Sequence, residues 1–227
     1  MAAKAKSTKT NSKPKLTKDR IIALYMDYVL EEGQQPKSIY KFSKDNGMEE
    51  ADFYSFFGSF QGLKEHIWIS FYENTVRVLH KDQGYSNYPN KEKLLSFYFT
   101  FFELLTANRS YVLFTLQEHK NSMKGLGQLK NLRIHFKDYA STLIEEGNEQ
   151  KNFKLAKNPV RLFSEGAWVQ LLFLIKYWMD DNSADFERTD IAIEKSVKVV
   201  FDVFETTPLE SVIDFGKFLF KDQFVKA

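Results

Sequence analysis

Residues 47–63 read GMEEADFYSFFGSFQGL, a pattern that predicts a tight turn followed by two helices. Gly47 tolerates the left-handed backbone conformation that a tight turn between two helices needs. Aromatic side chains then cluster within a short helix predicted at 49–57, and Ser59 can cap a long helix that begins at about residue 60. The segment therefore predicts the second half of a helix-turn-helix.

The residues before this segment supply the other two short helices. Apolar side chains at helical spacing predict a first helix over 17–32, which stops at Gly33. Ser38 can cap a second helix over 38–45, with Phe42 turned inward. Three short helices with a tight turn between the second and third form a helix-turn-helix on physical grounds alone.

This arrangement resembles the amino-terminal head of the TetR family of transcriptional regulators. The family pattern is a glycine, an aliphatic residue, several variable polar positions, Leu-Tyr, an aromatic pair ending in Phe, a short break, Ser-Lys-Glu and Leu. Here it runs from Gly47 through Tyr54 and Phe57 to Leu63, and the match covers roughly residues 17–65. The resemblance implies a DNA-binding head and a larger helical domain that binds a small effector and dimerises, often through a four-helix bundle.

The chain departs from the family pattern where the recognition helix begins. Carboxylates stand at Glu49, Glu50 and Asp52, where the family commonly has small polar residues or lysine, and Phe60 replaces the usual lysine of the fourth helix. By location these positions would face the groove or the phosphates. Carboxylates repel phosphate, but they can accept from a cytosine amino group. Either the head reads cytosine-containing sites, or it has lost much of its DNA affinity.

Further DNA contacts are expected from a basic arm at residues 1–16. Residues 1–20 hold seven cations against Asp19, whereas the whole chain has a net charge of only +2. Such an arm suits contact with a polyanion, and the alternative is a solubilising tail. Phosphate contacts are also expected around the second helix, and the resemblance implies one from Tyr54. The predicted DNA-binding residues are Lys13, Lys15, Lys18, Lys37, Ser38, Lys41, Glu49, Glu50, Asp52 and Tyr54.

The remainder of the chain also reads as helical, so the predicted fold is all-α, with a head at 17–62 and a larger domain at 63–227. Apolar residues recur at three- and four-residue intervals, without a convincing series of alternating strands. Asn158-Pro159 and Thr207-Pro208 each pair a capping side chain with proline at the first helical position. The further predicted helices are 60–82, 90–107, 109–119, 123–147, 159–181, 186–206 and 208–223.

Two of these helices are candidates for a dimer interface. The helix at 159–181 is apolar nearly all round, so more than one of its faces must be buried, and the helix at 186–206 also carries many aliphatic residues. The alternative is that both are internal helices of a monomer. Two-fold pairing would suit a palindromic operator on double-stranded DNA.

An apolar effector cavity is a further expectation, because 22 of the 227 residues are phenylalanine. Aromatic side chains at helical spacing could line such a cavity, although they are also typical of a plain core. A lipid or a planar aromatic compound is the expected kind of ligand. The candidate lining residues are Phe97, Tyr98, Phe101, Phe102, Phe114, Trp168, Phe173 and Tyr177.

The last predicted helix, 208–223, is rich in apolar residues and carries modest charge. Packing onto the body is one interpretation, and an interfacial helix that samples lipid is the other. A second function follows from the latter and from the acidic recognition helix: a TetR-like protein that binds lipid or another apolar ligand, with degraded DNA binding.

Other classes of function lack support in the sequence. The chain has no cysteine, no uncharged run long enough to span a bilayer, and a polar, lysine-rich start that predicts no secretory signal, so we expect a cytoplasmic protein. Its four histidines are scattered, and no nucleotide-binding or nucleophile-elbow motif occurs. We therefore expect no enzyme activity, no cofactor and no metal. The leading hypothesis is a homodimeric, ligand-responsive transcriptional regulator that acts as a repressor.

Overall fold

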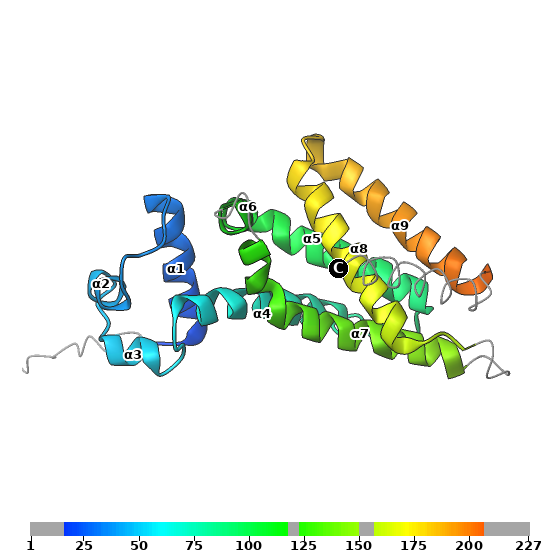
Figure 1. Cartoon of the computed structure of the whole chain (residues 1–227), viewed down its shortest axis with the longest axis horizontal. Helices are drawn as coiled ribbons and strands as arrows, with labels where there is room; N and C mark the ends of the chain where they lie inside the picture. Colours follow the sequence, from blue (N-terminus) through cyan, green and yellow to red (C-terminus); the bar gives the residue numbers. More distant parts are fainter. Residues whose placement is uncertain (1–15, 118–122, 150–156, 207–227) are drawn as a thin grey trace, which may run out of the picture. The chain divides into compact units, whose positions relative to one another are not determined.

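The computed structural model describes residues 16–117, 123–149 and 157–206, and these residues form only helices and their connections (Figure 1). This confirms the all-α prediction for the described part of the chain. The elements are α1 (Lys18–Glu32), α2 (Ile39–Asp45), α3 (Glu50–Tyr54), α4 (Phe60–Leu79), η1 (Tyr85–Asn87), α5 (Asn90–Ala107), α6 (Arg109–Gln117), η2 (Met123–Leu129), α7 (Lys130–Glu149), α8 (Val160–Asp180), η4 (Ala184–Phe186) and α9 (Glu187–Thr206). The predicted arm at 1–16, apart from residue 16, and the predicted helix at 208–223 lie outside the described residues.

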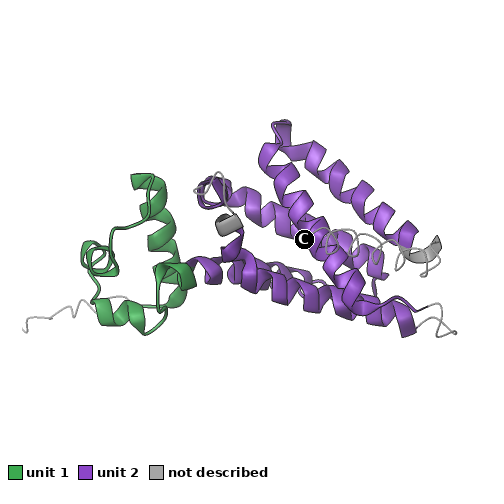
Figure 2. Cartoon of the chain, in the orientation of Figure 1, with its two compact units in different colours: residues 1–63 green, residues 64–227 purple. Residues whose placement is uncertain are grey.

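The chain divides into two compact units, residues 1–63 and 64–227, which Figure 2 shows in different colours. The sequence predicts a boundary one residue earlier, between residues 62 and 63. We call the first unit the head and the second the body, and describe each by itself.

The head is built around a cluster of aromatic rings. Phe60 stacks on Tyr25 with ring centroids 5.4 Å apart, and it meets Phe42 and Phe53 edge-on at 5.7 and 5.5 Å. Phe60 is only 8% exposed. The expectation that this position faces DNA was therefore wrong, because the aromatic side chain is drawn into the core of the head. Edge-to-face pairs of this kind add to the stabilisation that comes from burying the rings.

Two glycines with positive φ follow the first two helices. Gly33 ends α1 with φ +62°, and Gly47 lies between α2 and α3 with φ +66°. The predicted turn at Gly47 is thus confirmed. Side-chain caps begin the helices: Thr17 Oγ1 accepts from the Arg20 amide at 3.2 Å, and Ser38 Oγ accepts from the Lys41 amide at 3.1 Å.

A Gly47→Ala substitution should destabilise the head by about 1–2 kcal/mol, because a Cβ atom is disfavoured in the left-handed region. Apart from the two chain neighbours, no residue comes within 4 Å of the added Cβ, so the cost comes from the backbone conformation. Gly58→Ala is the matched control, since Gly58 also meets no neighbour and lacks the positive φ. Urea unfolding followed by circular dichroism measures both variants. Equal stabilities would contradict the assignment of the turn.

The body is a bundle in which α7 packs along α8, and α9 packs against both α5 and α8 (Figure 1). Phe97 on α5 is fully buried, and its ring centroid lies 5.3 Å from that of Phe136 on α7. A series of side-chain hydrogen bonds also crosses this core. The Tyr98 hydroxyl donates to Gln170 Oε1 at 3.1 Å, and Gln170 Nε2 donates to Ser196 Oγ at 2.9 Å, which ties α5, α8 and α9 together.

One predicted helix begins later than expected. The segment predicted at 123–147 starts as the 3₁₀ element η2, and the α-helix begins only at Lys130. Two glycines within η2 disfavour a regular α-helix there. The buried Gln128 also fixes this turn: its Oε1 accepts from Trp68 Nε1 and Thr115 Oγ1, at 3.1 and 2.8 Å.

A buried carboxylate fixes the corner between α8 and α9. Asp181 is 5% exposed and accepts four hydrogen bonds, from the amides and the hydroxyls of Ser183 and Thr189, at 2.7–2.9 Å. Burial raises the pKa of Asp181, but these hydrogen bonds outweigh burial and hold the pKa at about 2. Arg109 adds to the corner by donating to the carbonyls of Trp178 and Met179 at 3.0 and 3.2 Å.

The Asp181 corner predicts a pH-dependent contribution to stability. An unfolded aspartate has a pKa of about 3.9, so the lowered folded value means that Asp181 stabilises the fold above about pH 4 and loses this effect as the pH falls towards 2. Asp181→Asn should cost about 1–3 kcal/mol at neutral pH. The difference from the wild-type chain should narrow near pH 2, whereas the exposed neighbour Asp180→Asn should change little at any pH. Chemical unfolding at several pH values measures the difference in unfolding free energy between the variant and the wild-type chain. A difference that does not depend on pH would contradict this account.

Candidate functional site

The head presents exposed cations on α2 and just before its N-cap Ser38. Lys37, Lys41 and Lys44 are exposed, and Tyr40 between them is 59% exposed with the Lys44 ammonium 5.9 Å from its ring centroid. Lys41 pairs with Asp45 at 3.1 Å, and the hydrogen bond to Asp45 raises the pKa of Lys41. Both partners are exposed, so this ion pair can exchange readily for a phosphate.

The carboxylates at the start of α3 have partners within the head. Asp52 Oδ2 accepts from the Glu49 amide at 3.1 Å, which caps the five-residue helix. Tyr54 donates to Glu50 Oε1 at 3.3 Å. The pKa of Tyr54 is raised, mainly because its ring is partly buried and also because the negative charge of Glu50 lies nearby. The acidic residues therefore have a structural role in the free protein, and Tyr54 must release Glu50 before it can donate to a phosphate.

The described part of the head is acidic. Residues 16–63 contain five lysines and arginines against eight aspartates and glutamates, a net charge of −3. Residues 1–15 hold five lysines and no acidic residue, and these cations would counter the negative charge of residues 16–63 when the head meets a polyanion such as DNA.

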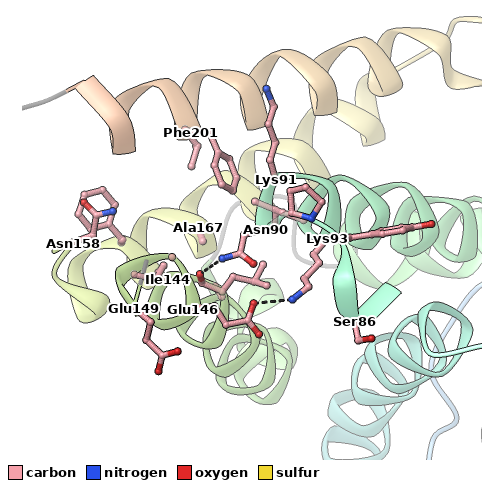
Figure 3. A pocket seen from close by; sticks show the side chains of 18 of the residues that line it. Ser86, Asn90, Lys91, Lys93, Ile144, Glu146, Glu149, Asn158, Ala167 and Phe201 are labelled. Atoms are coloured by element: carbon pink, nitrogen blue, oxygen red, sulfur yellow. Dashed lines mark hydrogen bonds and ion pairs between the residues drawn. The ribbon is translucent and has the colours of Figure 1, made fainter. Parts of the chain in front are cut away.

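The body contains a cavity of about 1060 Å³ between η1, α5, α7, α8 and α9, which Figure 3 shows from close by. We call it the body cavity. Phe201 extends towards it from α9, and Ala167 faces it from α8 (Figure 3). Its apolar lining includes Leu94, Ala140, Leu143, Ile144, Phe163, Ala167, Val200 and Phe201. Its polar lining includes Asn87, Asn90, Lys91, Lys93, Glu146, Glu149 and Asn158.

Polar contacts hold the walls of the body cavity together. Lys93 Nζ donates to Glu146 Oε2 at 2.8 Å, and Asn90 Nδ2 donates to the Leu143 carbonyl at 2.7 Å, so both contacts join α5 to α7 (Figure 3). Asn158 is held by Asn148, whose Oδ1 accepts from the Asn158 amide at 2.7 Å. The cavity is therefore amphipathic, with an apolar surface and a set of fixed polar groups beside it.

An apolar surface is exposed on α8 and α9. On α8, Val169, Phe173 and Tyr177 follow one another at four-residue spacing and are 63%, 54% and 37% exposed. On α9, Ile191 and Val199 are 48% and 60% exposed. The opposite side of α8 is buried. We call the exposed set the α8–α9 face, which also includes Leu162 and Val203.

Comparison with known families identifies the body. The sequence profile of the family described as "Tetracyclin repressor-like, C-terminal domain" matches residues 93–219, more than half of the chain. The chain belongs to the TetR family. It is thus a member of a family of transcriptional regulators, as the helix-turn-helix residues predicted.

A solved structure agrees with this TetR-family fold. The fatty acid degradation regulator FadR from Bacillus halodurans superimposes with a TM-score of 0.55 at 19% sequence identity, covering 86% of this chain and 97% of that chain. At this identity the similarity is one of fold. Comparison with curated proteins finds no significant sequence match.

The structure places the predicted DNA-binding residues of this TetR-family head as follows. Ser38 caps α2 and is exposed, as are Lys37 and Lys41, and α2 and α3 pack together. Lys18 is exposed in the first turn of α1, and Lys13 and Lys15 lie outside the described residues. Glu49, Asp52 and Tyr54 are exposed, and Glu50 is partly so. Their role in binding DNA stays a prediction.

Tyr40 is an exposed aromatic residue beside these lysines that is not among the DNA-binding residues predicted from the sequence. This residue lies in α2 four positions before Lys44, so helical spacing alone places these two side chains on one side of the helix, and Lys37 precedes the N-cap Ser38. A large aromatic residue among exposed cations was the available signal.

The predicted ligand-lining residues do not line the body cavity. Phe97 and Phe101 are fully buried, and Phe102 and Trp168 are 3% and 8% exposed, so these four belong to the core. Tyr98 is also buried, with its hydroxyl bonded to Gln170. Phe114 is partly exposed, whereas Phe173 and Tyr177 belong to the α8–α9 face. A ligand role for these residues stays a prediction.

The described part of the chain offers neither a metal site nor a membrane span. No group of three or more histidine, aspartate or glutamate side chains there is arranged to hold a metal ion. Among the described helices, none is both long and apolar enough to cross a bilayer.

Proposed function

We propose that this TetR-family chain is a homodimeric, DNA-binding transcriptional repressor whose affinity for its operator depends on a small apolar ligand. The observation that carries the proposal is the helix-turn-helix of α2 and α3 around Gly47, with the lysines of α2 exposed beside it. Phosphate contacts from α2 and from the basic arm would fix the head on the duplex, and α3 would enter the major groove.

The α8–α9 face supports dimerisation. Val169, Phe173 and Val199 are each more than half exposed, and several large exposed apolar side chains on two neighbouring helices are typical of an interaction site. Pairing with a second copy through a two-fold axis buries the same face on both chains. The result is a four-helix bundle of two α8 helices and two α9 helices.

The body cavity supports the ligand-binding part of the proposal. Its volume of about 1060 Å³ lies at the upper end of the range that small-molecule pockets usually occupy. The fold neighbour from Bacillus halodurans is described as a regulator of fatty acid degradation, which is consistent with an apolar ligand for the same architecture. Ligand binding between α5, α7, α8 and α9 would change the packing of the body and so shift the population of DNA-competent dimers.

Selection of bound genomic fragments by the purified full chain, at low and at near-physiological salt, tests the proposal. We expect enrichment of a palindrome whose half-sites lie about one helical turn (~34–36 Å) apart. Affinity should fall steeply as salt rises, because phosphate contacts release counterions. Absence of any enriched motif at low salt would rule out the regulator function.

A second function is favoured by the charge of the head. The net charge of −3 over residues 16–63 opposes binding to phosphates, so the chain could bind an apolar ligand without reading DNA. The same selection distinguishes the two: an apolar-ligand-binding protein would enrich no motif and would still bind ligand in the body cavity.

A further inference from the structure

The body cavity contains an ion pair whose two partners differ in burial. The Lys93 side chain is 11% exposed, the Glu146 side chain is 41% exposed, and Nζ lies 2.8 Å from Oε2 (Figure 3). Both residues line the cavity, Lys93 from α5 and Glu146 from α7. Lys91 lines it as well, one position along α5 from Glu92 and two from Lys93.

This difference in burial favours an anionic ligand. A buried ammonium is costly without a counter-anion, whereas a half-exposed carboxylate can be hydrated by water when it turns away. A ligand carboxylate can therefore replace Glu146 on Lys93 at small cost. A ligand cation would have to take Glu146 from Lys93 and leave the buried ammonium unpaired. The preference is for an anion, even though the charges of Lys91, Lys93, Glu146 and Glu149 cancel.

The apolar lining next to this pair fits a hydrocarbon body. Leu94 follows Lys93 directly on α5, and Leu143 and Ile144 precede Glu146 on α7. Phe201 and Ala167 add apolar surface from α9 and α8 (Figure 3). A molecule with one charged end can thus keep that end at Lys93 while its apolar part covers these side chains.

We propose that the body cavity binds an amphipathic carboxylate, with an apolar chain against α7, α8 and α9 and a head group that replaces Glu146 on Lys93. This inference rests on the ligand-binding role of the cavity in the proposed function. It names the charge of the ligand and the residue that recognises it.

Dodecanoate and dodecanol provide the test, because they share a hydrocarbon chain and differ in the head group. Calorimetric titration of the full chain at neutral pH should show dodecanoate binding about ten- to a hundredfold more tightly than dodecanol, as expected for a hydrogen bond between charged groups. Lys93→Met should remove this preference. Glu146→Gln should instead strengthen dodecanoate binding several-fold, because it removes the competing carboxylate.

Two further variants control the experiment. The Lys93→Met/Glu146→Gln double variant leaves no unpaired charge, so it should fold, bind dodecanol as the wild-type chain does, and show no preference for dodecanoate. Glu145→Gln changes an exposed neighbour that does not line the cavity, and it should bind both compounds like the wild-type chain.

The outcomes distinguish the inference about the head group from the ligand-binding role of the cavity. Equal binding of the two compounds by the wild-type chain, or an unchanged preference in Lys93→Met, overturns the inference about the head group and leaves the cavity's ligand role intact. If neither compound binds the wild-type chain, both the head-group inference and the ligand role of the cavity are wrong, while operator selection still tests DNA binding independently.

Discussion

A Phe173→Glu variant should be monomeric and should lose most of its operator affinity. Phe173 lies in the middle of the α8–α9 face, between Val169 and Tyr177 at helical spacing, and is 54% exposed in the single chain. A glutamate there stays hydrated in the monomer, so the fold of the body should be preserved. In a two-fold interface the change occurs twice, and two carboxylates would be buried without partners.

The expected loss of dimer affinity follows from the presence of two buried carboxylates in each interface. Each unpaired buried charge costs several kcal/mol, so the dimer dissociation constant should rise by at least about a hundredfold. Operator affinity should fall as well, because two linked heads bind with an effective concentration that a single head lacks. Sedimentation over a concentration series measures the first effect, and titration of a labelled operator measures the second.

Ile134→Glu is the matched control for Phe173→Glu. Ile134 is 52% exposed, so the two positions are equally accessible, but it lies on α7 outside the α8–α9 face. This variant should remain dimeric and bind the operator normally. Dimerisation by Phe173→Glu as strong as that of the wild-type chain would show that the interface lies elsewhere.

The sequence predicted the helix-turn-helix well because its determinants are local. Gly47 has the positive φ that its place between two helices required, and Ser38 caps α2 as expected. Phe60 shows where local reasoning failed. Its position in the family pattern suggested a DNA contact, but a large aromatic side chain gains more by packing against Phe42 and Phe53 than by facing solvent.

The body cavity could not be found from aromatic residues, for a physical reason. Large rings such as Phe97 and Phe101 fill the space that they line, and the two stack on each other at 5.7 Å. Empty space remains instead beside small residues, and Ala140, Gly147 and Ala167 all line the cavity. Small residues are too common in helices to mark a cavity without the tertiary arrangement of α5, α7, α8 and α9.

Removal of residues 1–15 should greatly weaken DNA binding, and it should do so regardless of the DNA sequence. These residues hold five lysines, whereas residues 16–63 have a net charge of −3. The shortened head would therefore approach the phosphates with a repulsive charge. We expect affinity for non-specific duplex DNA to fall by at least about a hundredfold at low salt, and the salt dependence to become shallower by about 0.9 for each lost phosphate contact.

The salt dependence separates a contacting arm from a solubilising tail. An arm that lies on DNA should give a steeper slope of log affinity against log salt in the full chain than in the shortened chain. Substitution of the five lysines by glutamine keeps the length of the segment, so it should reproduce the deletion if charge is responsible. An unchanged slope after both changes would instead support a tail with no part in binding. The head would then have to hold DNA through Lys37, Lys41 and Lys44 against its own carboxylates, and the acidic start of α3 would favour the ligand-binding function without DNA.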